Sequence, residues 1–253
     1  MVTVKPLIAI VPVAGSGSRI KEITQGTNKS LLQIPMAYET FLHRTIRQCV
    51  DAGAEHVILV VGYRAEAIRE ALIGCSTPVS IIKNHAWAAT GNGYSLYLGL
   101  LAVPDGHDVL YFQPDVVVPD SFVANLSEWW GRMSTPKELL VAVDLKERAE
   151  EASQVVLGAG GVVRIGKGIP LDESDGSWIP IAFLSENSAR AYTDAADVVF
   201  DNDLRAYDVD VFDQMITAGT GCAYEHIEKR RWMEVDTPEE YFRLTRWQQE
   251  KLI

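Results

Sequence analysis

The sequence contains few cysteines and no close pair of them. Cys49, Cys75 and Cys222 are the three cysteines in a chain of 253 residues, and none belongs to a Cys-x-x-Cys motif. An odd number of widely spaced cysteines argues against a disulfide framework and against a structural zinc site. The pattern is typical of a reducing compartment, so we expect a cytoplasmic protein.

Positive charge is also scarce. The chain has 23 Lys and Arg residues against 34 Asp and Glu residues, which gives a formal net charge of −11. Nucleic acid and anionic membrane surfaces repel a protein of this charge unless a local basic cluster compensates. We therefore set aside nucleic-acid binding and membrane binding as main functions.

Long hydrophobic runs are absent near the start of the chain. The longest apolar run there covers residues 7–14 and is too short to span a bilayer. Lys5 before this run and small residues after it would allow a signal peptide. A buried strand that leads into a glycine-rich loop explains the same residues better.

The first half of the chain shows a regular alternation of strand-like and helix-like segments. Four apolar runs predict strands, at 8–13, 56–61, 78–82 and 108–113. Three segments between them predict helices, at 38–49, 65–73 and 95–102. The apolar stripe of the first helix begins at Tyr38, and Gly53 is placed to end it. This order implies right-handed crossovers and an α/β, Rossmann-like three-layer fold with a mostly parallel central sheet.

The second half of the chain is less regular. We expect strands at 138–143 and 179–183, a pair of strands within 155–165 around a glycine turn, and a helix at 185–195. Thr237, Pro238 and Glu240 have the residue types and spacing that begin a last helix. No repeat or linker divides the sequence, so we expect a single domain over residues 1–253.

A glycine-rich loop follows the first predicted strand. It reads Ala14-Gly15-Ser16-Gly17-Ser18-Arg19, and Lys29 follows ten residues after Arg19. Glycines let successive backbone N–H groups point at one anion, and Arg19 and Lys29 would add positive charge for a polyphosphate. The arrangement predicts phosphate binding, with a tight structural turn as the alternative.

Two other phosphate-binding motifs fit the sequence less well. A dinucleotide-binding loop needs a third glycine where this chain has Ile20. The segment Gly161–Lys167 approaches a P-loop, but Gly168 replaces the required hydroxyl and the segment lies between two predicted strands.

The glycine-rich loop together with residues 27–32 resembles the signature of the nucleotidyltransferases that activate sugars and small alcohol phosphates. That family usually reads Ala-Ala-Gly-x-Gly-(Ser/Thr)-Arg and then Pro-Lys-x-Leu. Asn28 replaces the proline, as in the phosphocholine cytidylyltransferase branch. Three later segments also resemble the family, and they cover residues 84–96, 163–168 and 232–239. The resemblance extends over about residues 7 to 245.

The resemblance implies a GT-A-like architecture and a particular reaction. The enzyme would transfer CMP from CTP to the phosphate or phosphonate group of a small alcohol-type acceptor and release pyrophosphate. Possible acceptors are 2-hydroxyethylphosphonate or another phosphonate, inositol 1-phosphate and phosphocholine, and neither the acceptor nor the oligomeric state is predicted. Residues 1–118 would form the nucleotide-binding half, and residues 119–253 the acceptor-binding half.

The resemblance also implies the site residues. Lys29 and Arg19 would contact the phosphates of CTP, and Asp115 and Asp236 would hold Mg²⁺, which prefers carboxylate oxygens. Both aspartates end strand-like runs, where an α/β sheet places its ligand crevice. Further substrate-binding residues would be Ala14, Gly15, Ser16, Gly17, Ser18, Asn84, Asn92, Gly93, Ser95 and Lys167. Trp87 and Tyr94 would flank the acceptor or belong to the core, whereas Trp129 and Trp130, on a predicted helix, fit the core or an interface better than the site.

One departure and three alternatives stay open. The family usually has Gly-Asp after the fourth strand, and this chain has Gln113-Pro114-Asp115. The first alternative is a sugar-1-phosphate nucleotidyltransferase that uses UTP or dTTP, and the second is a non-catalytic nucleotide-sensing module. The third is a hydride-transferring oxidoreductase.

Overall fold

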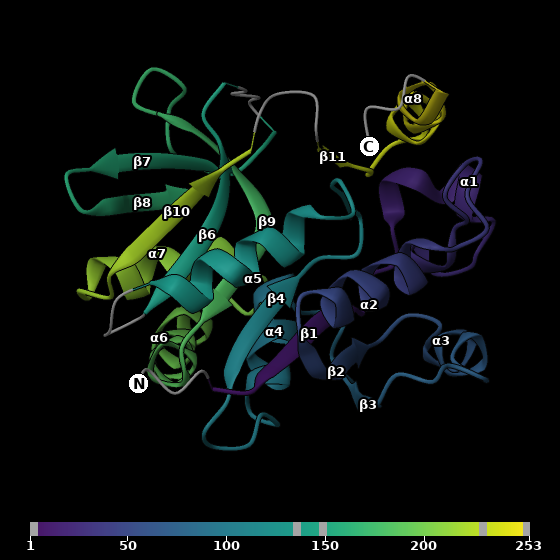
Figure 1. Cartoon of the computed structure of the whole chain (residues 1–253), viewed down its shortest axis with the longest axis horizontal. Coiled ribbons are helices and arrows are strands. Elements are labelled where there is room, and N and C mark those ends of the chain that lie inside the picture. The colour runs from purple at the N-terminus through teal and green to yellow at the C-terminus, as the bar shows by residue number, and fades with distance from the viewer. Residues whose placement is uncertain (1–4, 134–137, 147–150, 228–231, 250–253) are drawn as a thin grey trace.

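The computed structural model describes residues 5–133, 138–146, 151–227 and 232–249 (Figure 1). Its strands are β1 (Leu7–Val13), β2 (Ala54–Val61), β3 (Val79–Lys83), β4 (Asp108–Phe112), β5 (Val116–Val117), β6 (Leu139–Asp144), β7 (Gln154–Gly158), β8 (Gly161–Gly166), β9 (Gly176–Leu184), β10 (Cys222–His226) and β11 (Met233–Glu234). Its α-helices are α1 (Lys21–Thr24), α2 (Phe41–Asp51), α3 (Ala65–Ala71), α4 (Asn92–Leu100), α5 (Phe122–Arg132), α6 (Glu186–Asn202), α7 (Asp208–Thr217) and α8 (Pro238–Gln249).

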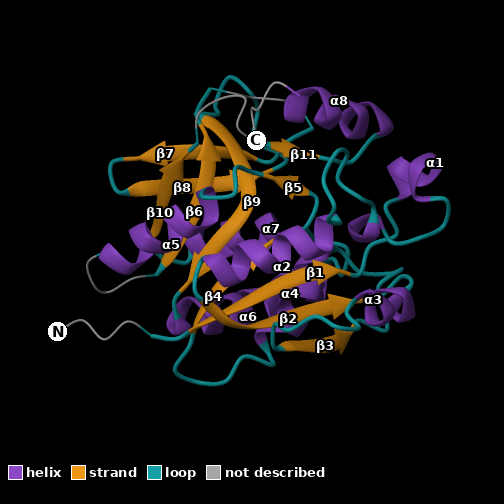
Figure 2. Ribbon diagram, turned by 45° about the vertical axis from the view of Figure 1, so that its right-hand side comes forward, coloured by secondary structure: helices purple, strands orange, loops and turns teal. Residues whose placement is uncertain are grey.

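The central sheet is mostly parallel, as the sequence predicts. Its strands follow the order β10-β6-β9-β4-β1-β2-β3, and β7 and β8 form a hairpin attached to β9 (Figure 2). β1 pairs in parallel with β2 and β4, whereas β9 runs antiparallel to β4 and β6. The reversal at β9 places the strands of the second half beside those of the first half in one sheet.

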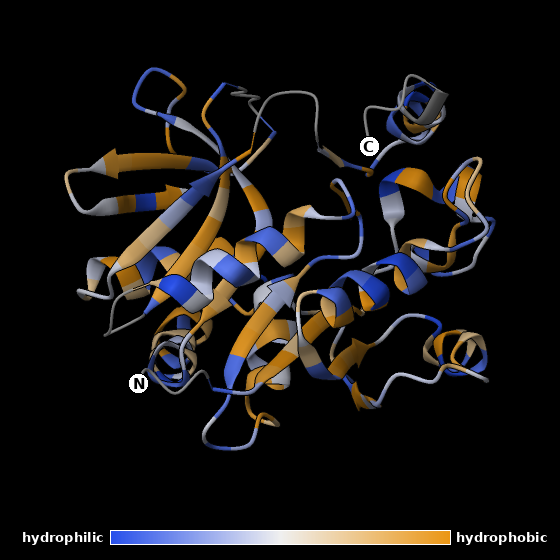
Figure 3. Ribbon diagram, viewed as in Figure 1, coloured by the Kyte–Doolittle hydropathy of each residue, from blue (hydrophilic) through white to orange (hydrophobic). Residues whose placement is uncertain are grey.

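Helices cover both faces of the sheet, which confirms the three-layer prediction. Successive residues of β1 point to opposite faces, so Ala9 and Val11 pack toward α2 and α5 while Ile8 and Ile10 pack toward α4, α6 and α7. Figure 1 looks onto the face that carries α2 and α5. Apolar colour follows the strands β4 and β6, and hydrophilic patches mark the outer sides of α2 and α5 (Figure 3). Among the described residues, no helix is both long and apolar enough to cross a membrane.

The structure corrects the sequence prediction at the start of α2. Tyr38 is fully exposed and precedes the helix instead of belonging to its core-facing stripe. The helix begins after Thr40. The Oγ1 atom of Thr40 accepts a hydrogen bond from His43 N and so caps the first turn of the helix. Gly53 follows the helix with a φ of 91°, as predicted. α7 and β10 are additional elements that the periodicity did not indicate.

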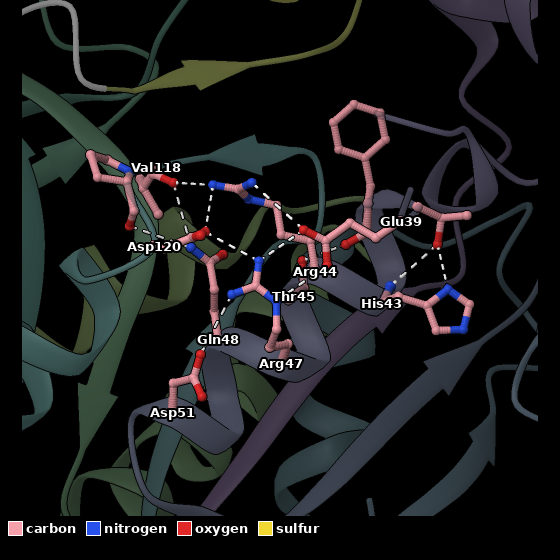
Figure 4. Close-up of polar contacts among 12 residues, drawn as sticks. Glu39, His43, Arg44, Thr45, Arg47, Gln48, Asp51, Val118 and Asp120 are labelled. Carbon is pink, nitrogen blue, oxygen red and sulfur yellow. Dashed lines mark hydrogen bonds and ion pairs between the residues drawn. The ribbon is translucent and has the colours of Figure 1, made fainter. Parts of the chain in front are cut away.

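A buried arginine of α2 fixes the chain immediately after β5 (Figure 4). Arg44 Nη2 donates to Val118 O over 2.7 Å and lies 3.0 Å from Asp120 Oδ1. Gln48 Nε2 donates to the same Val118 carbonyl over 3.4 Å. A buried guanidinium requires such partners because its desolvation is otherwise uncompensated. The cluster thereby anchors β5 on α2, and β5 carries one side of the site described below.

Candidate active site

Four charged side chains from distant parts of the chain form one ion cluster. Lys29 Nζ donates to Asp115 Oδ2 and to Asp236 Oδ1, in each case over 2.6 Å. Arg19 Nη2 donates to Asp236 Oδ2 over 2.5 Å. The side chains of Lys29, Asp115 and Asp236 are only 15, 14 and 18% exposed. These four residues are those that the sequence predicts as catalytic.

A small second sheet brings the two aspartates together. β5 pairs antiparallel with β11, and Val235 N donates to Asp115 O over 2.9 Å just beyond this pairing. Asp236 then leads into α8, where Thr237 N and Asp236 N both donate to Glu240 Oε2 and Glu240 N donates to Thr237 Oγ1. This reciprocal cap, which the sequence predicts, fixes Asp236 between β11 and α8.

Glu234 is a third carboxylate of the cluster, and the sequence analysis missed it as a site residue. Asp115, Glu234 and Asp236 each offer an oxygen within 4.8 Å of the others. Burial raises the pKa of Glu234 to about 8, with further contributions from Asp115 and Asp236. The available signal was the strand alternation, since Glu234 and Asp236 are two residues apart and extended chain places such residues on one side.

The donor set of this cluster fits a hard divalent cation. Asp115 Oδ1 is buried and has no hydrogen-bond partner among the described residues, so it is free to act as a ligand. Three carboxylates are the type of ligand that Mg²⁺ takes. Lys29 balances their charge here: burial would lower its pKa, but Asp115 and Asp236 outweigh burial and hold the pKa above its usual value. Asp236 is affected in the opposite sense, because Lys29 and Arg19 overcome burial and lower its pKa.

One side of the cluster opens into a cavity of about 590 Å³, which we call the loop cavity. All six residues of Ala14–Arg19 line it, together with Lys29, Asn92 and Ser95. Gly17 has a φ of 59°, and a Cβ there would lie 3.0 Å from Lys29 Cβ. Only glycine adopts this conformation without strain and allows Lys29 so near. The loop therefore lies directly beside the charged cluster.

Asn28 ties the loop to the rest of the site. Its Nδ2 donates to Val13 O over 2.9 Å and to Tyr63 O over 3.0 Å. Its Oδ1 accepts hydrogen bonds from the backbone N and the hydroxyl of Ser30. The proline that usually stands here in the family could form none of these side-chain contacts. Asn28 thus connects the start of the loop with Tyr63 and with the turn that carries Lys29.

Two of the predicted substrate-binding residues lie behind the cavity wall. Asn84 is buried and donates to Ser95 Oγ over 3.3 Å, while its Oδ1 accepts from Ala86 N. Gly93 is buried against Tyr207, since a Cβ on it would come within 2.9 Å of the Tyr207 backbone. Neither residue lines a cavity of the site. Both support the wall from which Asn92 and Ser95 face the loop cavity.

The other side of the cluster opens into a second cavity of about 490 Å³, which we call the tryptophan cavity. Trp178, Trp232 and Trp247 line it, and Lys167 lies over the ring of Tyr207 at 4.1 Å from the centroid. The two cavities share Arg19, Asn92, Gln113, Asp115, Tyr207 and Asp236. The charged cluster therefore stands at the junction of two adjoining spaces.

The aromatic residues considered in the sequence analysis occupy different places. Trp87 lines the loop cavity. Tyr94 packs against Phe200 with its ring centroid 5.5 Å away, so it belongs to the helical layer. Trp130 is buried and donates through Nε1 to Asp108 Oδ2, as expected of a core residue.

Asp115 stays in the cluster despite the Gln113-Pro114 departure, and Gln113 belongs to a buried polar network. Asp208 is fully buried and accepts hydrogen bonds from the Tyr111 hydroxyl, from Gln113 Nε2 over 2.8 Å and from Asn92 Nδ2 over 3.1 Å. Burial raises the pKa of Asp208, and these donors oppose the rise. The network joins β4, α4 and α7 under the junction of the two cavities.

The chain is similar to known proteins both in sequence and in fold. Residues 9–196 match the family model of the MobA-like NTP transferase domain. Choline-phosphate cytidylyltransferase from Haemophilus influenzae is 43% identical over 58 residues, which cover 23% of this chain and 24% of that protein. The chain aligns with only 13–24% of the length of the curated relatives that it matches.

Solved structures of low sequence identity share the fold over almost the whole chain. The inositol-1-phosphate CTP transferase from T. maritima has a TM-score of 0.77 at 18% identity and covers 94% of each chain. A UDP-glucose pyrophosphorylase complexed with UDP-glucose also has a TM-score of 0.77, at 13% identity, and covers 97% of this chain and 99% of that one. The fold is therefore the GT-A-like nucleotidyltransferase fold.

Proposed function

Because the chain belongs to the MobA-like NTP transferase family, we propose that it is an enzyme that transfers CMP from CTP to a small phosphate or phosphonate acceptor. Pyrophosphate is the second product. The observation that carries the proposal is the cluster of Lys29, Asp115 and Asp236 at the junction of two cavities. A nucleotidyl transfer needs this arrangement, because two anionic substrates have to meet at one charged centre.

The loop cavity is suited to the triphosphate. Its glycine-rich wall brings backbone groups close to an anion, and Lys29 and Arg19 supply fixed positive charge beside it. Lys29 would neutralise charge that develops on the α-phosphate. Arg19 lies at the edge of both cavities and would hold the phosphates that leave.

The tryptophan cavity is suited to the acceptor. The attacking group of the acceptor is a phosphate or phosphonate oxygen. This oxygen is already anionic near neutral pH, so no strong general base is required. Lys167, an exposed residue that lines this cavity, would attract that group. Mg²⁺, held by Asp115 and Asp236 with Glu234, would stabilise the charge on the α-phosphate.

The division of the chain supports the proposed roles of its two halves. Most residues that line the loop cavity belong to residues 1–118, and most of those that line the tryptophan cavity belong to residues 119–253. The three free cysteines, two of them buried, fit the proposed cytoplasmic location.

The activities of known relatives support CTP as the nucleotide. A choline-phosphate cytidylyltransferase and an inositol-1-phosphate CTP transferase are among them. The similar fold of a UDP-glucose pyrophosphorylase is the reason to keep a second candidate function. This second candidate is a sugar-1-phosphate nucleotidyltransferase that uses UTP or dTTP. The complete cluster of Lys29, Asp115 and Asp236 favours an enzyme over a non-catalytic nucleotide sensor.

Nucleotide choice and acceptor class are tested together. CTP, UTP and dTTP, each labelled at the α-phosphate, are incubated with Mg²⁺ and a panel of phosphonates, phosphocholine, inositol 1-phosphate and glucose 1-phosphate. Transfer of label from CTP with release of pyrophosphate supports the proposal. Transfer only from UTP or dTTP to the sugar phosphate supports the second candidate, and nucleotide binding without any transfer supports the sensor.

A further inference from the structure

Gln113 stands at the junction of the two cavities and takes no part in the charged cluster. It follows β4, two residues before Asp115, and lines both the loop cavity and the tryptophan cavity. Its backbone N donates to Pro180 O over 3.1 Å. Pro180 and Asp208, which accept from its backbone N and its side chain, line only the tryptophan cavity. Gln113 is therefore attached to the wall on the acceptor side.

The orientation of the Gln113 amide is fixed by Asp208. Nε2 donates to Asp208 Oδ2 over 2.8 Å, and a carboxylate accepts but does not donate. The nitrogen must face Asp208, so the carbonyl oxygen faces away from it. Among the described residues, no donor pairs with Gln113 Oε1, and this atom is not among the buried unpaired ones. The junction therefore presents a fixed hydrogen-bond acceptor atom.

Asn92 is the other amide side chain at the junction, and its nitrogen and its oxygen both have partners. Its Nδ2 donates to Asp208 Oδ1 and its Oδ1 accepts from Asp208 N, each over 3.1 Å. Both ends of the Asn92 side chain are therefore engaged with Asp208. Of the two amides that line both cavities, Gln113 is the one with an oxygen left for a ligand.

A donor without a partner lines the same tryptophan cavity. Trp178 Nε1 is buried and has no hydrogen-bond partner among the described residues. The Trp178 ring stacks on Tyr111 with centroids 6.5 Å apart, and the Tyr111 hydroxyl donates to Asp208. A buried donor left unpaired costs free energy unless a ligand oxygen meets it. Trp178 Nε1 itself is buried, so of these two unpaired atoms Gln113 Oε1 is the one that a ligand can reach, and a hydroxyl group can donate to it.

We propose that Gln113 is a specificity-determining residue, whose carbonyl oxygen accepts a hydrogen bond from a hydroxyl group that the acceptor substrate carries near its phosphate or phosphonate. The inference rests on the proposed function for the existence of an acceptor substrate. A trimethylammonium group has no N–H and would leave Gln113 Oε1 unpaired, so the site would reject it.

The test measures binding, so it does not depend on turnover. Isothermal titration calorimetry compares 2-hydroxyethylphosphonate with ethylphosphonate, which lacks only the hydroxyl, on protein loaded with Mg²⁺ and α,β-methylene-CTP. The wild-type protein should prefer the hydroxylated ligand by about tenfold. Gln113→Met should reduce the preference to within about twofold. Tyr111→Phe is the matched control, because it removes another donor to Asp208 from a residue that lines neither cavity, and it should keep the preference.

Each outcome decides the proposal. It is overturned if the wild-type protein shows no preference, if it binds neither ligand, if Gln113→Met keeps the preference, or if Tyr111→Phe loses it equally. Tighter binding of 2-aminoethylphosphonate or phosphocholine than of the hydroxylated ligand also overturns it. Should Gln113→Met fail to fold, Gln113→Asn carries the same test, because its shorter amide cannot keep Asp208 and reach the same ligand position. The proposed function is tested separately by pyrophosphate release from CTP.

Discussion

Lys29 and Asp236 are separated by 207 residues in the chain, yet Lys29 Nζ donates to Asp236 Oδ1 over 2.6 Å. The same ammonium group donates to Asp115. Lys29 thus balances, within the protein, the negative charge of carboxylates that would also bind a cation. We therefore expect the stability of the site and its affinity for Mg²⁺ to depend on each other.

Replacing Lys29 by methionine tests this dependence. Two largely buried carboxylates would then face each other, so without Mg²⁺ the free energy of unfolding should fall by about 2 kcal/mol. Added Mg²⁺ should recover most of the loss, while kcat/KM falls by about 10²-fold. Thermal melts in EDTA and in Mg²⁺ measure the first effect, with Lys21→Met, an exposed lysine of α1, as the control. A loss of stability that Mg²⁺ does not recover would contradict the charge argument.

The three carboxylates should contribute to metal binding in the same way. Asp115→Asn, Asp236→Asn and Glu234→Gln should each leave a folded protein with turnover reduced by about 10²-fold or more at limiting Mg²⁺. Glu239→Gln, which removes an exposed carboxylate in the first turn of α8, should keep turnover within about twofold. Turnover as a function of Mg²⁺ concentration measures the effect. Normal Mg²⁺ dependence of Glu234→Gln would remove Glu234 from the metal site.

Asn28 should prove more important for the loop than its small size indicates. Asn28→Ala removes the donor to Val13 O and Tyr63 O, so the protein should lose about 1–3 kcal/mol of stability and KM for CTP should rise. Asn28→Pro fits the backbone, whose φ is −75°, but should lose as much because proline supplies no donor. Thr27→Ala is the neighbouring control. Chemical denaturation and steady-state kinetics measure both effects, and a proline variant as stable as the wild type would show that the backbone alone fixes the loop.

The two glycines of the loop should respond differently to alanine. Gly17 has a positive φ and lies close to Lys29, whereas a Cβ on Gly15 would meet nothing within 4 Å. Gly17→Ala should therefore cost about 1–2 kcal/mol of stability, and Gly15→Ala should stay within about 0.5 kcal/mol. Paired denaturation curves of the two variants measure the difference. Equal stabilities would mean that the loop relaxes around Gly17 without strain.

Much of the fold could be predicted from the sequence because its signals are local. The strand 8–13 and the loop after it adjoin in the chain, and β1 was found at Leu7–Val13. Thr237 and Glu240 are close enough to cap α8 by themselves. Such elements depend on residues that are neighbours in the sequence, so a short segment contains the whole signal for them.

The errors in the predicted helices also arose from local sequence patterns. Tyr38 continues the apolar spacing of α2, but the Thr40 cap begins the helix after it. α7 was missed since Val209 and Val211 alternate like a strand, and its helical conformation comes with packing against α6 and β8. Local spacing could not decide between these alternatives.

The sequence by itself determined the layered α/β fold and the glycine-rich loop, and it predicted the residue types of a site for phosphates and a divalent cation. Only the tertiary structure decided that Glu234 joins Asp115 and Asp236, because that depends on the pairing of β5 with β11. The tertiary structure also decided that Asp208 accepts a hydrogen bond from the Asn92 amide and orients the Gln113 amide. Hydrogen bonds between residues about a hundred positions apart follow from the order of strands and the packing of helices, and no local periodicity contains that information.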